Sequence, residues 1–124
     1  MDTIVFDIET KNTFADVGGD RNIDKLDVSV VCIYSYEKDE YICFEEHEFN
    51  ALGDILQRAH LLVGFSSKRF DVPVLNKYFK FNLAAIPHYD ILEEQKMFFS
   101  NFFYYLLHAT LSYYFEKLYL VNNI

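Results

Sequence analysis

Two acidic residues stand two positions apart near the start of the chain, in the run Ile4-Val5-Phe6-Asp7-Ile8-Glu9-Thr10. The run is apolar enough to form a buried central strand. Side chains alternate faces along a strand, so Asp7 and Glu9 should point the same way, roughly 6.5–7 Å apart. Ionised carboxylates are costly to bury without a positive charge nearby, and a bound divalent cation would supply one. A strand end that frays into solvent would explain the same two residues without any cation.

A third acidic residue, Asp71, follows a second apolar run in residues 61–75, LLVGFSSKRFDVPVL. The pattern predicts a buried strand over 61–65, a serine-rich turn, and then a helix with Asp71 at its head. Asp is a good helix N-cap and Pro73 suits a first helical turn, so the local residues by themselves favour a capping role for Asp71.

The two stretches together resemble a known family. VFDIET, followed by a strand and GFSSKRFDVPVLNKYF, resembles the first two motifs of the DEDD 3'–5' exonucleases of the ribonuclease H-like superfamily, closest to its small bacterial and archaeal predicted-exonuclease branch. The resemblance covers about residues 1–96. It implies a site for two Mg²⁺ or Mn²⁺ ions, with Asp7, Glu9 and Asp71 as catalytic residues and metal ligands.

The activity that this resemblance implies is metal-dependent hydrolysis of phosphodiester bonds at the 3' end of a nucleic acid, either DNA or RNA, without a small-molecule cofactor. Two bound ions can activate a water and stabilise the leaving oxygen. The substrate-binding residues expected from the matching positions are Thr10, Lys11, Ser66, Lys68 and Arg69.

The chain departs from the family pattern in two places. The second motif usually has Asn where this chain has Ser66, which has a shorter reach. The third motif, a Tyr or His followed by a fourth acid, is not found. Asp90 stands beside His88 and Tyr89, but at the end of a predicted strand and not on a later helix, so we expect it to have a supporting role. We therefore expect a truncated or frame-disrupted copy, or a fragment whose remainder lies elsewhere, with weak or no activity.

The remaining apolar patterns predict the elements that must position these residues. Residues 28–36 and 41–44 flank a polar turn, as in a β-hairpin, and residues 49–59 have helical spacing. A helix over 72–79 and a strand over 86–91 follow. Right-handed crossovers make the later strands parallel to their neighbours. We expect an α/β, ribonuclease H-like fold, with a mixed central sheet of antiparallel hairpin strands and parallel strands, and flanking helices.

Composition limits the functional classes. The chain has 124 residues, 52% of them hydrophobic, and a net charge of −8. An acidic chain is poorly suited to bind nucleic acid non-specifically along its length, because phosphate binding rests on Lys and Arg. It can still be a metal nuclease. No signal peptide is recognisable at Met1, so we expect a cytoplasmic protein in which Cys32 and Cys43 are reduced, buried thiols.

Residues 97–124 form a separate, aromatic-rich segment after the predicted domain over 1–96. From Met97 to Phe115 there is no Asp, Glu, Lys or Arg. That length reaches the minimum for a membrane span, but polar residues such as Asn101 and His108 argue against one. Two alternatives to the exonuclease therefore stay open: a non-catalytic module of the same fold that binds metal or nucleic acid, and a protein attached to a membrane through this tail. Oligomeric state is left open.

Overall fold

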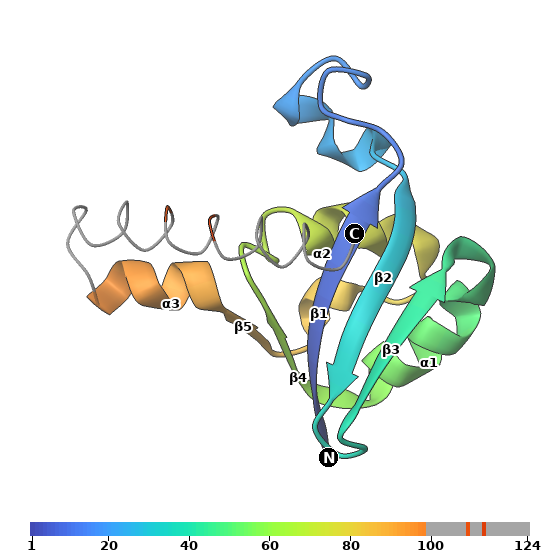
Figure 1. The fold of residues 1–124 in the computed structure, drawn as a ribbon, viewed down its shortest axis with the longest axis vertical. Helices are drawn as coiled ribbons and strands as arrows, with labels where there is room; N and C mark the ends of the chain where they lie inside the picture. Colours follow the sequence, from blue (N-terminus) through green and yellow to red (C-terminus); the bar gives the residue numbers. More distant parts are fainter. Residues whose placement is uncertain (99–108, 110–112, 114–124) are drawn as a thin grey trace. The chain divides into compact units, whose positions relative to one another are not determined.

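A computed structural model describes residues 1–98 of the chain together with residues 109 and 113 (Figure 1). The chain divides into two compact units, Met1–Ile91 and Leu92–Ile124, which are described separately. All residues predicted to form the site lie in the first unit.

The first unit is built on a five-stranded sheet with strand order β3-β2-β1-β4-β5. The strands are β1 (Asp2–Thr10), β2 (Val28–Ser35), β3 (Glu40–Glu45), β4 (Ala59–Gly64) and β5 (His88–Asp90). The β1–β2 and β2–β3 pairs are antiparallel, whereas β1–β4 and β4–β5 are parallel. The predicted mixed sheet is therefore confirmed, with the strand that carries the acid pair at its centre.

The helical segments connect these strands. They are η1 (Asp20–Lys25), η2 (Glu46–Glu48), α1 (Phe49–Arg58), α2 (Asp71–Leu75), η3 (Asn76–Tyr78) and η4 (Leu83–Ala85), where η marks a 3-10 turn. Helix α1 agrees with the helix predicted over 49–59. The predicted helix over 72–79 divides into α2 and η3. The Asn76 side chain accepts a hydrogen bond from the Leu83 N–H at 2.7 Å, which fastens this turn to the next segment.

One face of the sheet forms the core with α1 and α2 (Figure 1). On β1 the side chains of Ile4, Phe6 and Ile8 are buried against it. The intervening Asp7 and Glu9 point to the opposite face, where both are exposed. The period of two in β1 thus separates core residues from acids, as predicted from the alternation of strand side chains.

The segment between β1 and β2 contains the 3-10 turn η1. Lys77 fastens its end to the domain: the ammonium donates to the Leu26 carbonyl at 2.6 Å and to Asp27 Oδ1 at 2.9 Å. These two bonds fix the position of the end of the segment, directly before β2.

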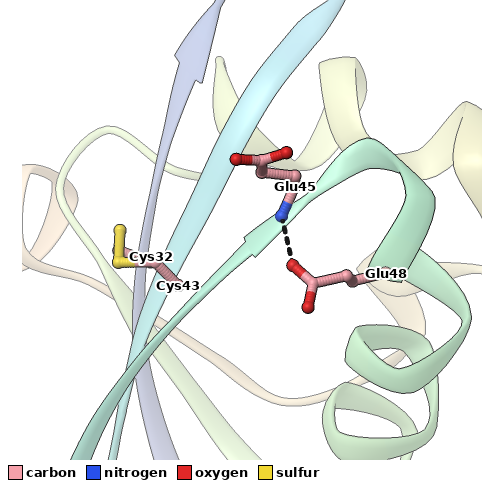
Figure 2. Close-up of a disulfide and its surroundings, with 4 residues drawn as sticks. All are labelled: Cys32, Cys43, Glu45 and Glu48. Carbon is pink, nitrogen blue, oxygen red and sulfur yellow. Dashed lines mark hydrogen bonds between the residues drawn. A yellow bond between two sulfur atoms is a disulfide. The ribbon is translucent and has the colours of Figure 1, made fainter.

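The two cysteines form a disulfide between β2 and β3, so the prediction of reduced, buried thiols was wrong (Figure 2). Cys43 is exposed and Cys32 is half-buried. The prediction used the absence of an export signal, whereas pairing is decided by the hairpin register, which places Cys32 directly opposite Cys43 with 4.1 Å between their Cα atoms.

Helix α3 (Ile91–Phe98) leads into the second unit. The predictions for the aromatic tail fall mostly on residues outside the described part of the chain. Within the described part, no helix has the length and apolar character needed to cross a membrane.

Candidate functional site

The acid pair of β1 lies on the face of the sheet that faces away from the core. Both carboxylates reach solvent, yet the neighbouring strands remove part of the hydration of Asp7. This desolvation, followed by repulsion from Glu9, raises the pKa of Asp7 above its ordinary value. Two like charges at this spacing favour any cation that neutralises them.

Asp71 reaches β1 because β1 is longer than its parallel neighbour. The last pair between them is Val5 with Val63, and β4 ends one residue later at Gly64. Beyond that point the backbone N–H of Ile8 donates to Asp71 Oδ1 at 3.2 Å. A carboxylate 63 residues away in sequence is thereby fastened to the peptide between the two acids of β1.

The surroundings of Asp71 favour its neutral form. Its side chain is 3% exposed. Burial, followed by the charge of Asp7, raises the pKa of Asp71 to about 7. Asp71 therefore lies close enough to Asp7 to be affected by its charge, and a shared role in metal binding stays a prediction. The capping alternative is wrong, because Phe70 occupies the cap position and makes no side-chain cap bond, while Asp71 is the first residue of α2.

A fourth acid, Asp90, organises the turn before Asp71. Asp90 is fully buried at the end of β5, and its two oxygens accept the backbone N–H groups of Ser66 at 2.9 Å and Lys68 at 3.0 Å. Its charge makes a further, smaller contribution to the raised pKa of Asp71. The expectation that Asp90 has a supporting role is confirmed by these two hydrogen bonds.

Ser66 adopts a left-handed backbone conformation in this turn, with φ at 55°. Non-glycine residues rarely adopt it, and Asn does so several-fold more readily than most. The Asn that the family resemblance leads one to expect at this position therefore has a backbone explanation, in addition to any contact with substrate.

The predicted substrate residues that follow the acid pair are held by local contacts. Thr10 Oγ1 donates to the Asn12 carbonyl at 2.8 Å, and the Lys11 ammonium forms an ion pair with Glu46. The hydrogen bond to Glu46 and the charge of Glu46 raise the pKa of Lys11. The Lys11 ammonium is therefore already paired with a carboxylate. Lys11 and Glu46 also line a shallow hollow of about 590 Å³ at this end of the sheet.

The predicted residues of the second motif lie elsewhere on the surface. Lys68 and Arg69 are exposed in the turn between β4 and α2. Lys68 lines a different hollow, of about 500 Å³, together with Val72 and His88.

The chemistry of these carboxylates suits a hard divalent cation, but their arrangement suits one less well. Carboxylate oxygens are the ligands that Mg²⁺ and Mn²⁺ prefer. Burial raises the pKa values of Asp7 and Asp71 first, and the charges of Glu9 on Asp7 and of Asp7 on Asp71 raise them further; a cation would relieve this repulsion. Within the described residues, however, no three His, Cys, Asp or Glu side chains are positioned to hold one ion together.

Sequence reasoning missed that the disulfide lies in register with Asp7. Cys32 pairs with Asp7 on one side and with Cys43 on the other. A hairpin pairs residues symmetrically about its turn, and the observed turn, 36–39, is centred midway between Cys32 and Cys43. The predicted turn, 37–40, was displaced by one residue and therefore concealed this pairing.

Comparison with protein families matches most of the chain to one family model. A family model described as RNase_H superfamily matches residues 4–102. Comparison with curated proteins finds no match. Among solved structures, the family B DNA polymerase from the hyperthermophilic archaeon Pyrobaculum calidifontis is similar, with a TM-score of 0.47 and 19% identity over 63% of this chain and 11% of the polymerase chain. The chain thus spans only about a tenth of that polymerase.

Proposed function

The chain belongs to the RNase_H superfamily, and on that basis we propose that it is a metal-dependent nuclease domain that hydrolyses phosphodiester bonds at the 3' end of a nucleic acid. The five-stranded mixed sheet is that of an α/β, ribonuclease H-like fold, and nucleases of this kind generally use divalent metals. The 3' end and the exonuclease branch are the finer part of the proposal and rest on the two sequence motifs.

The observation that supports the site is the hydrogen bond from the Ile8 N–H to Asp71. It fastens the acid of the second motif beside Asp7 and Glu9 of the first. Asp7, Glu9 and Asp71 would hold Mg²⁺ or Mn²⁺, and the bound ions would activate water and stabilise the departing oxygen.

The protein's own contribution is to position and tune these carboxylates. β1 holds Asp7 and Glu9 on its exposed face, and the Ile8 N–H orients one oxygen of Asp71. With its pKa at about 7, Asp71 gives up its proton near neutral pH, so cation binding at Asp71 must compete with that proton. The bonds from Asp90 to the Ser66–Lys68 turn fix the backbone from which Asp71 starts.

Low turnover is part of the proposal. The fourth acid of the family pattern, and the Tyr or His before it, are not recognisable in the sequence. General-base assistance of the kind those residues supply is typically worth about 10²–10⁴-fold.

The test is degradation of single-stranded DNA and RNA oligonucleotides labelled at either end, with Mn²⁺, Mg²⁺ or a chelator. Slow shortening from the 3' end that needs the cation and is lost in Asp7→Asn is expected. Asp54→Asn is the matched control, because Asp54 is an exposed acid on α1, on the core side of the sheet. Shortening that persists in Asp7→Asn would refute the site.

A non-catalytic module of the same fold that binds metal or nucleic acid is the second candidate, because the last motif of the family pattern is not recognisable in the sequence. Such a module would bind Mn²⁺ or a labelled oligonucleotide and leave every oligonucleotide intact. Binding without cleavage, lost in Asp7→Asn, would select the module over the nuclease.

A further inference from the structure

The Cys32–Cys43 disulfide lies in one row with the acid pair of the candidate site. Asp7 is directly opposite Cys32, which is directly opposite Cys43. Directly opposed residues in antiparallel strands point to the same face of a sheet. Asp7, Cys32 and Cys43 therefore form a continuous row across β1, β2 and β3, called here the acid–disulfide row.

The two cysteines of this row differ in exposure. Cys43 is exposed and lies on β3, at the edge of the sheet, whereas Cys32 is half-buried between β1 and β3. Figure 2 shows the disulfide near the end of β3. At that end the Glu45 N–H donates a hydrogen bond to the Glu48 carboxylate at 2.9 Å. A thiol that approaches from solvent therefore meets Cys43, the more exposed residue, first.

We propose that this disulfide is a site of thiol–disulfide exchange entered at Cys43, and that its redox state regulates cation binding at Asp7. The regulatory half rests on the proposed function. The reacting partner is a small thiol, and its thiolate is the nucleophile.

The exchange is balanced in two steps. The thiolate attacks the Cys43 sulfur and forms a mixed disulfide, the Cys32–Cys43 bond breaks, and the Cys32 sulfur leaves with the electron pair and takes a proton from water. A second small thiolate then attacks the sulfur of the first and releases Cys43 as a thiol. The two small thiols end as their own disulfide and have supplied both electrons.

Cation binding depends on this cross-link because β2 supports β1 along the whole acid-bearing stretch. β2 pairs with β1 from Ile4 to Thr10, and the disulfide fastens β2 to β3 at the row that contains Asp7. Asp7 and Glu9 repel each other, so a rigid support keeps them preorganised for a cation. Reduction loosens that support, and a less preorganised site binds more weakly.

The entry point is tested with two single-cysteine variants of the full chain, Cys32→Ser and Cys43→Ser. Both lack the disulfide, so any loss of stability is shared. Alkylation of Cys43 in Cys32→Ser should be about tenfold faster than alkylation of Cys32 in Cys43→Ser, because accessibility governs reaction. In the wild type, glutathione should form an adduct mapped to Cys43 without denaturant. Equal alkylation rates, an adduct on Cys32, or an adduct only after unfolding would overturn the entry point.

The regulatory half is tested by Mn²⁺ calorimetry on oxidised and phosphine-reduced protein. Reduction should weaken wild-type binding about threefold or more through lost preorganisation. The double variant Cys32→Ser/Cys43→Ser, which has no redox chemistry, should bind equally under both conditions. Equal wild-type affinities would overturn the coupling alone. No heat of Mn²⁺ binding in any form would overturn the coupling and the proposed site together, and the mapped adduct would then decide the exchange site by itself.

Discussion

The backbone N–H of Ile8 donates a hydrogen bond to Asp71 Oδ1 at 3.2 Å, at the point where β4 has ended and β1 continues. The missing strand neighbour leaves a peptide donor unpaired, and an unpaired buried donor is costly. Asp71 satisfies it and is in turn held beside the acid pair. One hydrogen bond thus satisfies the Ile8 N–H beyond the end of β4 and fastens Asp71 to the strand that carries the acid pair.

The raised pKa of Asp71 makes the stability of the domain depend on pH. An Asp with a pKa of 3.8 in the unfolded chain and about 7 in the folded one binds more protons when folded, so the free energy of unfolding should fall as pH rises from about 4 to 7. Asp71→Asn keeps an oxygen for the Ile8 N–H and removes the charge. It should raise stability at pH 8 by about 2–4 kcal/mol, with little effect at pH 4.

Urea unfolding of both proteins at pH 4, 6 and 8 measures this difference. Asp54→Asn, at an exposed position, should follow the wild-type curve. An Asp71→Asn variant that is less stable than wild type at pH 8 would show that the carboxylate is charged and stabilising in the folded state.

Asp7→Asn should show that the acid pair lowers stability without a cation and is needed for stabilisation by a cation. Without cations, removing one of two repelling charges should raise the melting temperature, whereas the increase caused by Mn²⁺ in the wild type should disappear. Thermal denaturation with and without Mn²⁺ measures both effects. A lower melting temperature of the variant without cations would assign Asp7 a structural hydrogen bond instead.

Gly64 is required by the close approach of β4 to the turn that follows it. A Cβ at this position would lie 2.6 Å from Ser67 Cβ, so Gly64→Ala must shift the backbone of the Asp71 turn. We expect a loss of about 1–3 kcal/mol, typical of overpacking. Urea unfolding checks it, and the double variant Gly64→Ala/Ser67→Gly should recover part of the loss because the opposing Cβ is gone. No recovery would place the strain elsewhere.

Ser66→Asn should stabilise the turn. Asn tolerates the left-handed conformation better than Ser, and Ser66 has φ at 55°. A gain of about 0.5–1 kcal/mol is expected, in the range of other backbone-compatible substitutions. Ser29→Asn is the control, because Ser29 lies in β2, where Asn is disfavoured. Destabilisation by Ser66→Asn would mean that the larger side chain meets its neighbours.

Local sequence determined the strands and the placement of acids upon them. In β1 the alternation of Ile4, Phe6 and Ile8 with Asp7 and Glu9 requires that the acids share the face opposite the core, because strand side chains alternate. Helical spacing likewise located α1, whose Phe49, Leu52 and Leu56 are buried. These features depend on neighbours a few residues away, which a single sequence displays directly.

Only the tertiary structure decided how distant residues meet. The sequence around Asp71 favoured a helix cap, yet its carboxylate bonds to Ile8, because β4 stops short and leaves that N–H open. The disulfide was missed for a related reason: the prediction of free thiols rested on the absence of a recognisable export signal, whereas the register of β2 and β3 places Cys32 opposite Cys43. Strand lengths and registers result from packing of the whole core, so local propensity does not specify them.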